Sequence, residues 1–248
     1  MEYFFTEHLT PQQYKELLFL YSCCEENDKI HYECPNADEW DIFILAYNSV
    51  RLVGCLTYMK DSEPECPGEA SGIVLPAYRR KGIYGNMLSS LLSHTNTDII
   101  LSGKDNYPGI SEFANALGYT YCNKEYLLQY ESKTFIPSQI SDLDVDFDEE
   151  DNTYYYTKSY KNEDILIGRC SVLEEKDTIN IFDVFVFPQY RNNGYAHKII
   201  SDVLWDLVNS GKIIQLQVSA MNVTALKVYT DCGFTIKDNV IFYSKNKF

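Results

Sequence analysis

Hydrophobic and polar positions follow one another along this chain in two runs of elements that have the same order. Phe43–Met59 and Tyr154–Leu173 each hold two stretches rich in β-branched and aromatic residues around a polar turn, which is typical of a β-hairpin. Further on, Ile83–Leu92 and Tyr195–Leu204 place apolar residues three and four positions apart, as the buried face of a helix requires. The pattern predicts a mixed α+β chain in which a hairpin and a helix occur twice.

The two runs form an internal repeat. LPAYRRKGIYGNMLS and VFPQYRNNGYAHKII align with an offset of 112, which places Pro76, Tyr78, Arg79 and Gly82 on Pro188, Tyr190, Arg191 and Gly194. Downstream, each half has a second apolar strand and a helical segment that ends in a glycine and an aromatic residue. A repeat this long predicts two related domains, because the repeats of solenoid proteins are shorter.

An acidic stretch marks the expected boundary between the domains. Seven of the ten residues from Asp142 to Asp151 are acidic, and like charges at that density repel one another and favour an extended connector. We therefore expect a first domain at 1–131, a linker at 132–152 and a second domain at 153–248. The first domain has an additional strand and helix before its hairpin, and the second lacks them.

Composition excludes several classes of function. The net charge is −15 and the pI is about 4.6, which disfavours nucleic acid as a partner because phosphate backbones require a basic face. No apolar run approaches the roughly 20 residues of a membrane span, and the N-terminus does not have the pattern of a secretion signal. We expect a cytoplasmic protein with no membrane partner, acting as a monomer or homodimer.

The eight cysteines are expected to be reduced thiols in that compartment. Cys23, Cys24, His31 and Cys34 form a cluster that contains metal-ligand residue types, but their spacing fits no common zinc pattern. No metal site is expected.

The strongest candidate for chemistry is the junction that follows the strand Thr178–Phe187. Pro188 ends the strand because it cannot donate to a ladder, and a helix is expected to start near Asn192. The first turn of a helix has free N–H groups and the positive end of its dipole. Gly194 lets an anion approach the backbone, and Arg191 can add a charge-assisted contact. These features predict a cradle for phosphate or pyrophosphate.

Two motifs in the second half then carry a family resemblance. V-x-P-x-x-R-x-x-G-x-A, which begins at Val186, is followed by L-x-V-x-x-x-N-x-x-A-x-x-x-Y-x-x-x-G-F, which begins at Leu216. Together they resemble the GNAT superfamily of acyl-CoA-dependent N-acyltransferases, once per half and most clearly in the second. The resemblance implies two GNAT-like domains, each an α/β (mixed α+β) unit with a mostly antiparallel central sheet flanked by helices.

The resemblance also implies acetyl-CoA as co-substrate and a set of site residues. The binding residues are Val184, Phe185, Val186, Arg191, Asn192, Asn193, Gly194, Tyr195, Ala196, His197 and Asn222. Tyr229 takes the place of the general acid that protonates the departing thiolate of CoA. Such a reaction needs a proton donor and an acceptor for the proton of the amine. Asp183 on the strand is the candidate base, and it could equally bind the charge of the substrate. Glu174 and Glu175 are weaker candidates.

The first half lacks these residues. Ala114 stands at the place of Tyr229, Ser71 at that of Asp183, and the bulkier Tyr84 at that of Ala196. We expect this half to be non-catalytic, and the sequence leaves open whether it binds CoA.

The resemblance thus implies an N-acetyltransferase that acts on a primary amine of a small molecule or peptide. The alternative is a non-catalytic sensor that only binds acyl-CoA.

Overall fold

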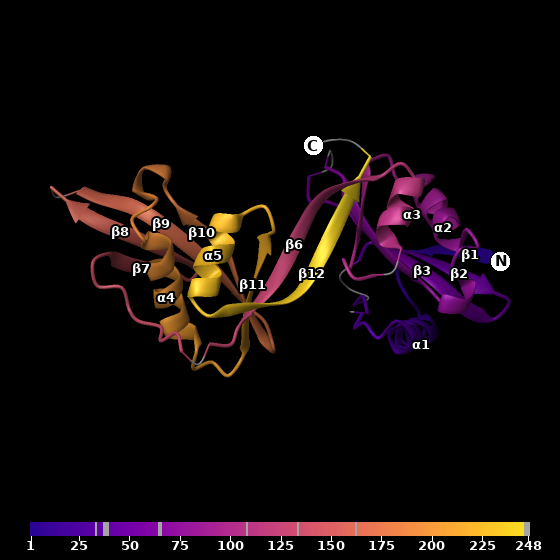
Figure 1. The fold of residues 1–248 in the computed structure, drawn as a ribbon, viewed down its shortest axis with the longest axis horizontal. Coiled ribbons are helices and arrows are strands. Elements are labelled where there is room, and N and C mark those ends of the chain that lie inside the picture. The colour runs from indigo at the N-terminus through magenta and orange to yellow at the C-terminus, as the bar shows by residue number, and fades with distance from the viewer. Residues whose placement is uncertain are drawn as a thin grey trace. The chain divides into compact units, whose positions relative to one another are not determined.

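The computed structural model describes residues 1–32, 34–36, 40–63, 66–107, 109–132, 134–161 and 163–245. They form five α-helices and twelve strands (Figure 1). The strand order is β1-β2-β3-β4-β5-β12-β6-β11-β10-β9-β8-β7. Eight pairs of neighbouring strands are antiparallel, whereas β4 with β5 and β10 with β11 are parallel. The mixed α+β class and the mostly antiparallel sheet are confirmed.

The chain divides into two compact units. Unit 1 comprises 1–123 and 240–248, and unit 2 comprises 124–239. Unit 1 contains β1 (Glu2–Thr6), α1 (Pro11–Asp28), β2 (Ile42–Asn48), β3 (Arg51–Met59), β4 (Gly68–Val74), α2 (Ile83–Leu92), β5 (Ile99–Gly103) and α3 (Ile110–Ala116). Unit 2 contains β7 (Asp144–Asp148), β8 (Thr153–Tyr160), β9 (Glu163–Glu174), β10 (Thr178–Val186), α4 (Tyr195–Leu207), β11 (Ile213–Ser219) and α5 (Val223–Asp231).

The two remaining strands each cross from one unit into the other. β6 (Thr120–Tyr130) ends the first repeat, but its second part pairs with β11 in unit 2. β12 (Phe234–Ser244) ends the second repeat, but its last part pairs with β5 in unit 1. Leu128 lies in the core of unit 2, and Ile241 and Tyr243 lie in the core of unit 1. Each repeat therefore supplies a strand to the unit of the other, and the compact units do not follow the expected limits at 131 and 153.

The acidic stretch before β8 is more structured than the connector that its charge predicts. Ser138 and Ile140 donate their backbone N–H groups to Ser201 and Asp202 of α4, at 2.9 and 2.7 Å. The alternating acids of Asp144–Asp148 then form strand β7, which pairs with β8 at the end of the strand order. Charged residues on an edge strand discourage pairing with other chains. Lys133 of the expected linker lies outside the described residues.

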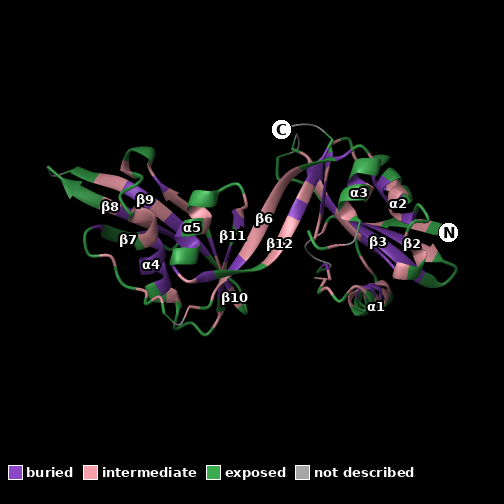
Figure 2. Cartoon of the chain, in the orientation of Figure 1, coloured by how far each residue is buried: buried purple, intermediate pink, exposed green. Residues whose placement is uncertain are grey.

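Helix α1 distinguishes the two units. Thr10 and Gln13 form a capping box at its N-terminus, and Pro11 occupies its first position. Its side chains Leu17, Leu20 and Cys24 are fully buried. Both α1 and α2 contact β3, and every residue from Leu52 to Tyr58 is buried (Figure 2). Continuous burial along a strand means that both faces of the sheet are covered there.

Unit 2 covers one face of its strands more fully than the other. Side chains of α4 and α5 share a core with Ile179 and Ile181 of β10, whereas Phe182 on the same strand is 49% exposed. No described helix of unit 2 takes the place that α1 has in unit 1.

Candidate active site

Strand β10 has a β-bulge where the sequence predicts the chemistry. Its pairing with β9 runs to Phe182, opposite Ser171, and resumes at Phe185, opposite Arg169. Asp183 and Val184 therefore share one position of the ladder, and Asp183 has a φ of 45°. Such an extra residue leaves backbone groups unpaired and redirects side chains, which is common beside active sites.

The same strand also separates from β11. Their parallel pairing extends from Thr178 to Ile181, yet β10 continues to Val186 and β11 to Ser219. Past Ile181, this side of β10 has no ladder partner in β11. Because unpaired backbone N–H and C=O groups need a hydrogen-bond partner, the stretch that includes Val184, Phe185 and Val186 is suited to binding an extended ligand.

The turn after β10 leads directly into the N-terminus of α4. Pro188–Tyr190 forms a single 3₁₀ turn, Asn192 has a φ of 63° and Gly194 a φ of 78°. The prediction that the helix starts near Asn192 was wrong: α4 starts at Tyr195, because these left-handed residues cannot continue a right-handed helix. No side chain caps this helix, and a Cβ added at Gly194 would meet no atom within 4 Å.

That N-terminus brings the predicted cradle residues together. The N–H groups of Tyr195, Ala196 and His197 are those of the first helical turn, which have no partner inside the helix. They lie at the positive end of the helix dipole, next to Gly194, where an added Cβ would meet no atom within 4 Å. The local geometry thus has the features that bind phosphate groups.

Arg191 is held in place by the strand before it. Its Nε donates to the carbonyl oxygen of Val186 at 2.9 Å, and its guanidinium lies 5.6 Å from the ring centre of Phe185. Within the described residues it forms no ion pair. Its terminal nitrogens therefore remain available to an anion.

Asp183 is paired with Arg169 of β9. The Nε of Arg169 donates to one carboxylate oxygen, and its Nη2 donates to the other at 3.3 Å. Both side chains are partly exposed, at 42% and 36%. The pair raises the pKa of the Arg169 guanidinium, chiefly through this hydrogen bond. An amine that uses Asp183 must compete with Arg169 for its oxygen atoms.

Tyr229 lies on α5 with its side chain in the core of unit 2. It is 8% exposed, and its ring contacts that of Phe234 edge to face at 6.1 Å. Burial raises the pKa of its phenol to about 12, and neighbouring Cys170 and Cys232 contribute. Cys170 is the residue that faces the bulge of β10, so Tyr229 and the bulge lie in one neighbourhood.

The hydroxyl of Tyr229 has no hydrogen-bond partner among the described residues. Within that part of the chain, no fully buried side-chain oxygen or nitrogen lacks a partner. The two facts together require that the hydroxyl reaches the solvent-accessible surface, although the ring is buried. A phenol in this position can donate a hydrogen bond to a ligand.

Two predicted binding residues have local structural contacts. Asn222 is the N-cap of α5, where its side-chain oxygen accepts from the N–H of Ala225 at 3.1 Å. His197 lies 3.3 Å from Asp231 of α5, so it helps to join the two helices. Neither contact involves all the polar atoms of the side chain.

Sequence reasoning missed Arg169 and the bulge. No glycine or proline marks the bulge within β10. Arg169 lies opposite Phe185 only because of the register in which β9 and β10 pair. Gly168 gives the one local signal, because a Cβ there would lie 2.5 Å from the carbonyl oxygen of Phe185. A side chain at that position would push the irregular strand away.

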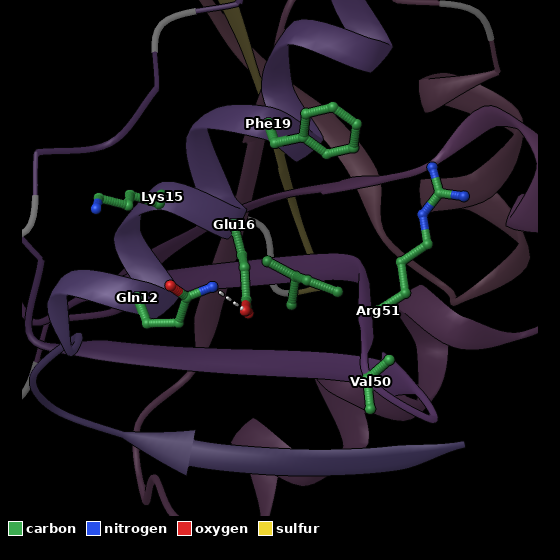
Figure 3. Close-up of a pocket in the computed structure, with 7 residues that line it drawn as sticks. Gln12, Lys15, Glu16, Phe19, Val50 and Arg51 are labelled. Carbon is green, nitrogen blue, oxygen red and sulfur yellow. Dashed lines mark hydrogen bonds between the residues drawn. The ribbon is translucent and has the colours of Figure 1, made fainter.

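Other features of the described residues do not compete with this site. They contain no cluster of metal-ligating side chains, and none of their helices has the length and apolar character of a membrane span. A surface pocket of about 350 Å³ lies in unit 1, between α1 and the turn before β3 (Figure 3). Its polar lining includes Glu16 and Arg51, and none of the predicted site residues lines it.

Comparison with known proteins gives one family match. Residues 123–234 match the model of the Acetyltransferase (GNAT) family. A search of curated proteins gives no match.

Solved structures resemble the whole chain. A GCN5-related N-acetyltransferase from Sphaerobacter thermophilus has a TM-score of 0.76 at 11% identity, over 97% of this chain and 94% of its own. A tandem GNAT protein from the clavulanic acid biosynthesis pathway has a TM-score of 0.68 at 13% identity, with both chains fully covered. A glucosamine N-acetyltransferase region of a fungal multi-domain β-N-acetylglucosaminidase has a TM-score of 0.71 at 10% identity, over 98% of this chain and 38% of that one.

At these identities the structural matches establish the fold. The family match covers nearly all of unit 2, in which the bulge, the uncapped helix and Tyr229 are found. The chain has the GNAT fold over its whole length, and residues 123–234, which make up nearly all of unit 2, match the Acetyltransferase (GNAT) family.

Proposed function

We propose that unit 2 transfers an acetyl group from acetyl-CoA to a primary amine of a small molecule or peptide. The observation that supports this most directly is the concentration of three features at one end of β10. They are the bulge with unpaired backbone beyond it, the uncapped N-terminus of α4, and the Tyr229 hydroxyl that lacks a partner.

The residues of unit 2 fit acetyl-CoA. The first turn of α4, with Gly194 at its start and Arg191 before it, has the free donors and the positive charge that suit a pyrophosphate group. The free edge of Val184–Val186 suits the amides of a pantetheine arm. When bound, acetyl-CoA supplies its acetyl group as a thioester. The nitrogen of the amine bonds to the carbonyl carbon, the carbon–sulfur bond breaks, and one proton passes overall from nitrogen to sulfur.

Tyr229 is the proposed proton donor to sulfur. With a pKa of about 12, the phenol stays protonated at neutral pH. A free thiol has a pKa of about 8.5, so the phenol is the weaker acid. Its hydrogen bond stabilises the charge developing on sulfur. When its proton passes to sulfur, the proton that Asp183 takes from the amine returns to the phenol.

Asp183 is the proposed acceptor of the proton from the amine. Its position in the bulge directs it away from the regular ladder, and Arg169 orients its carboxylate. The incoming ammonium exchanges with the guanidinium at one carboxylate oxygen. We expect Asp183→Asn to lower turnover, whereas Glu174→Gln leaves it unchanged.

Release of free CoA from acetyl-CoA, measured across amine classes, tests the function. Once a substrate is found, Tyr229→Phe should lower kcat by roughly 100-fold or more, within the usual range for a general acid, and leave the Kd for acetyl-CoA unchanged. Tyr126→Phe, a partly buried tyrosine elsewhere in unit 2, is the matched control and should behave as wild type.

Two outcomes oppose the proposal. Equal turnover by Tyr229→Phe and wild type would remove Tyr229 from its role. Binding of acetyl-CoA without CoA release for any amine class would favour the alternative, a sensor that only binds acyl-CoA.

A further inference from the structure

Units 1 and 2 contain the same turn with nearly the same backbone. Pro76–Tyr78 forms a 3₁₀ turn like that of unit 2, Gly82 has a φ of 76°, and α2 starts without a side-chain cap. The Nε of Arg79 donates to the carbonyl oxygen of Val74 at 3.0 Å, as Arg191 does to Val186 at 2.9 Å. The two arginines are thus anchored alike.

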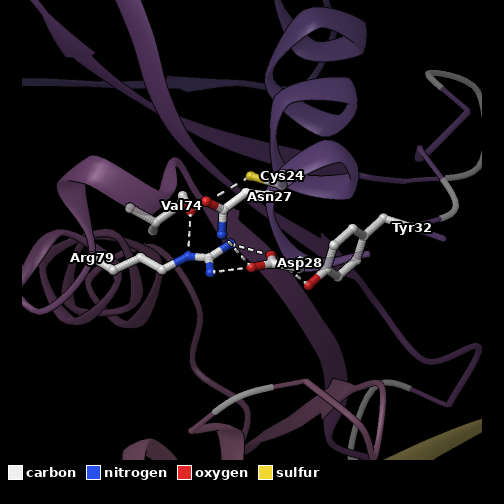
Figure 4. A network of polar contacts seen from close by, with 6 residues as sticks. All are labelled: Cys24, Asn27, Asp28, Tyr32, Val74 and Arg79. Carbon is white, nitrogen blue, oxygen red and sulfur yellow. Dashed lines mark hydrogen bonds and ion pairs between the residues drawn. The ribbon is translucent and has the colours of Figure 1, made fainter. Parts of the chain in front are cut away.

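The charge of Arg79, however, is already matched inside unit 1 (Figure 4). Its two terminal nitrogens donate to the two carboxylate oxygens of Asp28, at 2.8 and 2.5 Å. The Asp28 side chain is only 3% exposed, and the hydroxyl of Tyr32 donates to it at 3.0 Å. This bidentate geometry is the one that a phosphate group would adopt on a free guanidinium.

The opening between strands is also filled in unit 1. β4 and β5 stop pairing after Ala70 and Leu101, as β10 and β11 do in unit 2. Beyond that point the ring of Tyr84 lies so close to Gly72 that a Cβ there would be 3.0 Å from it, and Ile110 lies against Gly103 in the same way at 2.3 Å. These side chains take up the space beside the two strands.

A second aromatic ring holds Tyr84 in this position. Phe113 of α3 contacts Tyr84 with ring centres 4.5 Å apart. In addition, β4 pairs with β3 from Glu69 to Val74 without a bulge, so on that side its backbone is occupied by the ladder. In unit 2, the place of Tyr84 is taken by Ala196.

We infer that unit 1 is a self-occupied copy of the acyl-CoA site, in which Asp28 takes the position of the phosphate anion and Tyr84 with Phe113 fills the strand opening. The chain therefore binds one acyl-CoA. The claim that unit 2 binds this one acyl-CoA rests on the function proposed for unit 2. The claim that the copy in unit 1 is closed rests only on the contacts of Asp28 and Tyr84.

Hydrogen exchange of the wild-type chain with saturating acetyl-CoA tests the number of sites. The result expected is slower exchange at 183–197 and unchanged exchange at 71–85, with one molecule bound per chain by calorimetry. Slower exchange at 71–85, or two molecules bound, would overturn the inference. No binding at either place would refute the function proposed for unit 2, and the closure of unit 1 is then decided by a second probe.

That probe is inorganic pyrophosphate. In Asp28→Asn, which frees Arg79, pyrophosphate should slow exchange at 71–85 at least twofold, whereas wild type and the double variant Asp28→Asn with Arg79→Gln should show no change there. Equal slowing of exchange in wild type, or no slowing in a folded Asp28→Asn variant, would contradict the inference that Asp28 takes the position of the phosphate anion.

If Asp28→Asn does not fold, the variant Tyr84→Ala with saturating acetyl-CoA replaces it. This variant opens the strand gap and leaves Asp28 paired, so protection confined to 183–197 supports the inference and protection at 71–85 overturns it.

Discussion

The two ion pairs beside the two turns use the same chemistry in different surroundings. In unit 1, Arg79 and Asp28 meet where α1 covers the sheet, and the Asp28 side chain is 3% exposed. In unit 2, no described helix replaces α1, and Arg191 has no carboxylate partner among the residues that the structure describes. The nearby pair of Arg169 and Asp183 is partly exposed. Covering a sheet face thus converts an arginine that can bind a ligand into part of the structure. Three predictions test this difference, and another tests which strands complete each unit.

The largest effect is expected from Asp28→Asn. It leaves Arg79 without its counter-charge in a largely buried site, where loss of one partner costs about 3 kcal/mol or more. Asp183→Asn removes the equivalent charge from an exposed pair and should cost less than about 1 kcal/mol. Urea unfolding of both variants gives the two values. Equal losses would show that burial does not distinguish these pairs.

Nearly as large an effect should follow from Ile241→Ala in β12. Removing a buried isoleucine side chain costs about 2–5 kcal/mol. Although Ile241 ends the second repeat, the exchange protection lost should be that of β4 and β5 in unit 1. Leu128→Ala in β6 should instead expose β10 and β11 in unit 2. If each variant weakens the unit of its own repeat, the strand exchange is wrong.

A smaller effect is expected when the residue of unit 1 is moved into unit 2. Ala196→Tyr introduces at the α4 N-terminus the ring that Tyr84 supplies at α2, and the added volume should obstruct the cradle. The Kd for acetyl-CoA should rise about 100-fold, which corresponds to about 2.7 kcal/mol. Trp205→Tyr, at an exposed position of the same helix, is the control and should bind normally. Unchanged affinity in Ala196→Tyr would show that volume at this position does not close a site.

The smallest expected effect is on the stability of the folded chain at acidic pH. The hydrogen bond from Arg79 holds the pKa of Asp28 below its usual value, so the pair stabilises the folded chain fully above about pH 4, the unfolded value. This contribution is lost as the pH falls through the lower folded value. The stability difference between wild type and Asp28→Asn should be constant from pH 5 to 7 and shrink below pH 4. A difference that stays constant down to pH 3 would contradict the pairing.

The sequence predicted the repeated elements and the turn because local patterns specify them. The turn between β10 and α4 is marked in the sequence by Pro188, Asn192 and Gly194. The spacing of apolar residues identifies α2 and α4. The bulge at Asp183 has no such signal. It depends on the pairing of β9 with β10, which is set by contacts between distant residues.

The limits of the units were unpredictable for a related reason. Residues 234–244 read as the natural end of the second repeat, and no local property of Ile241 or Tyr243 indicates that β5 is their neighbour. The pairing of Arg79 with Asp28 is equally non-local, since 51 positions separate the two residues. The two repeats are similar at matching places, whereas Asp28 lies on a helix that only the first repeat has.

The crossing of β12 into unit 1 has a consequence for synthesis. A ribosome makes β5 before it makes unit 2, but the strand β12 that pairs with β5 follows unit 2 in the chain. Until then β5 presents an open edge, which is a template for pairing with other chains. Unit 1 is thus completed only after unit 2 has been synthesised, and a premature stop before β12 would leave β5 without that partner strand.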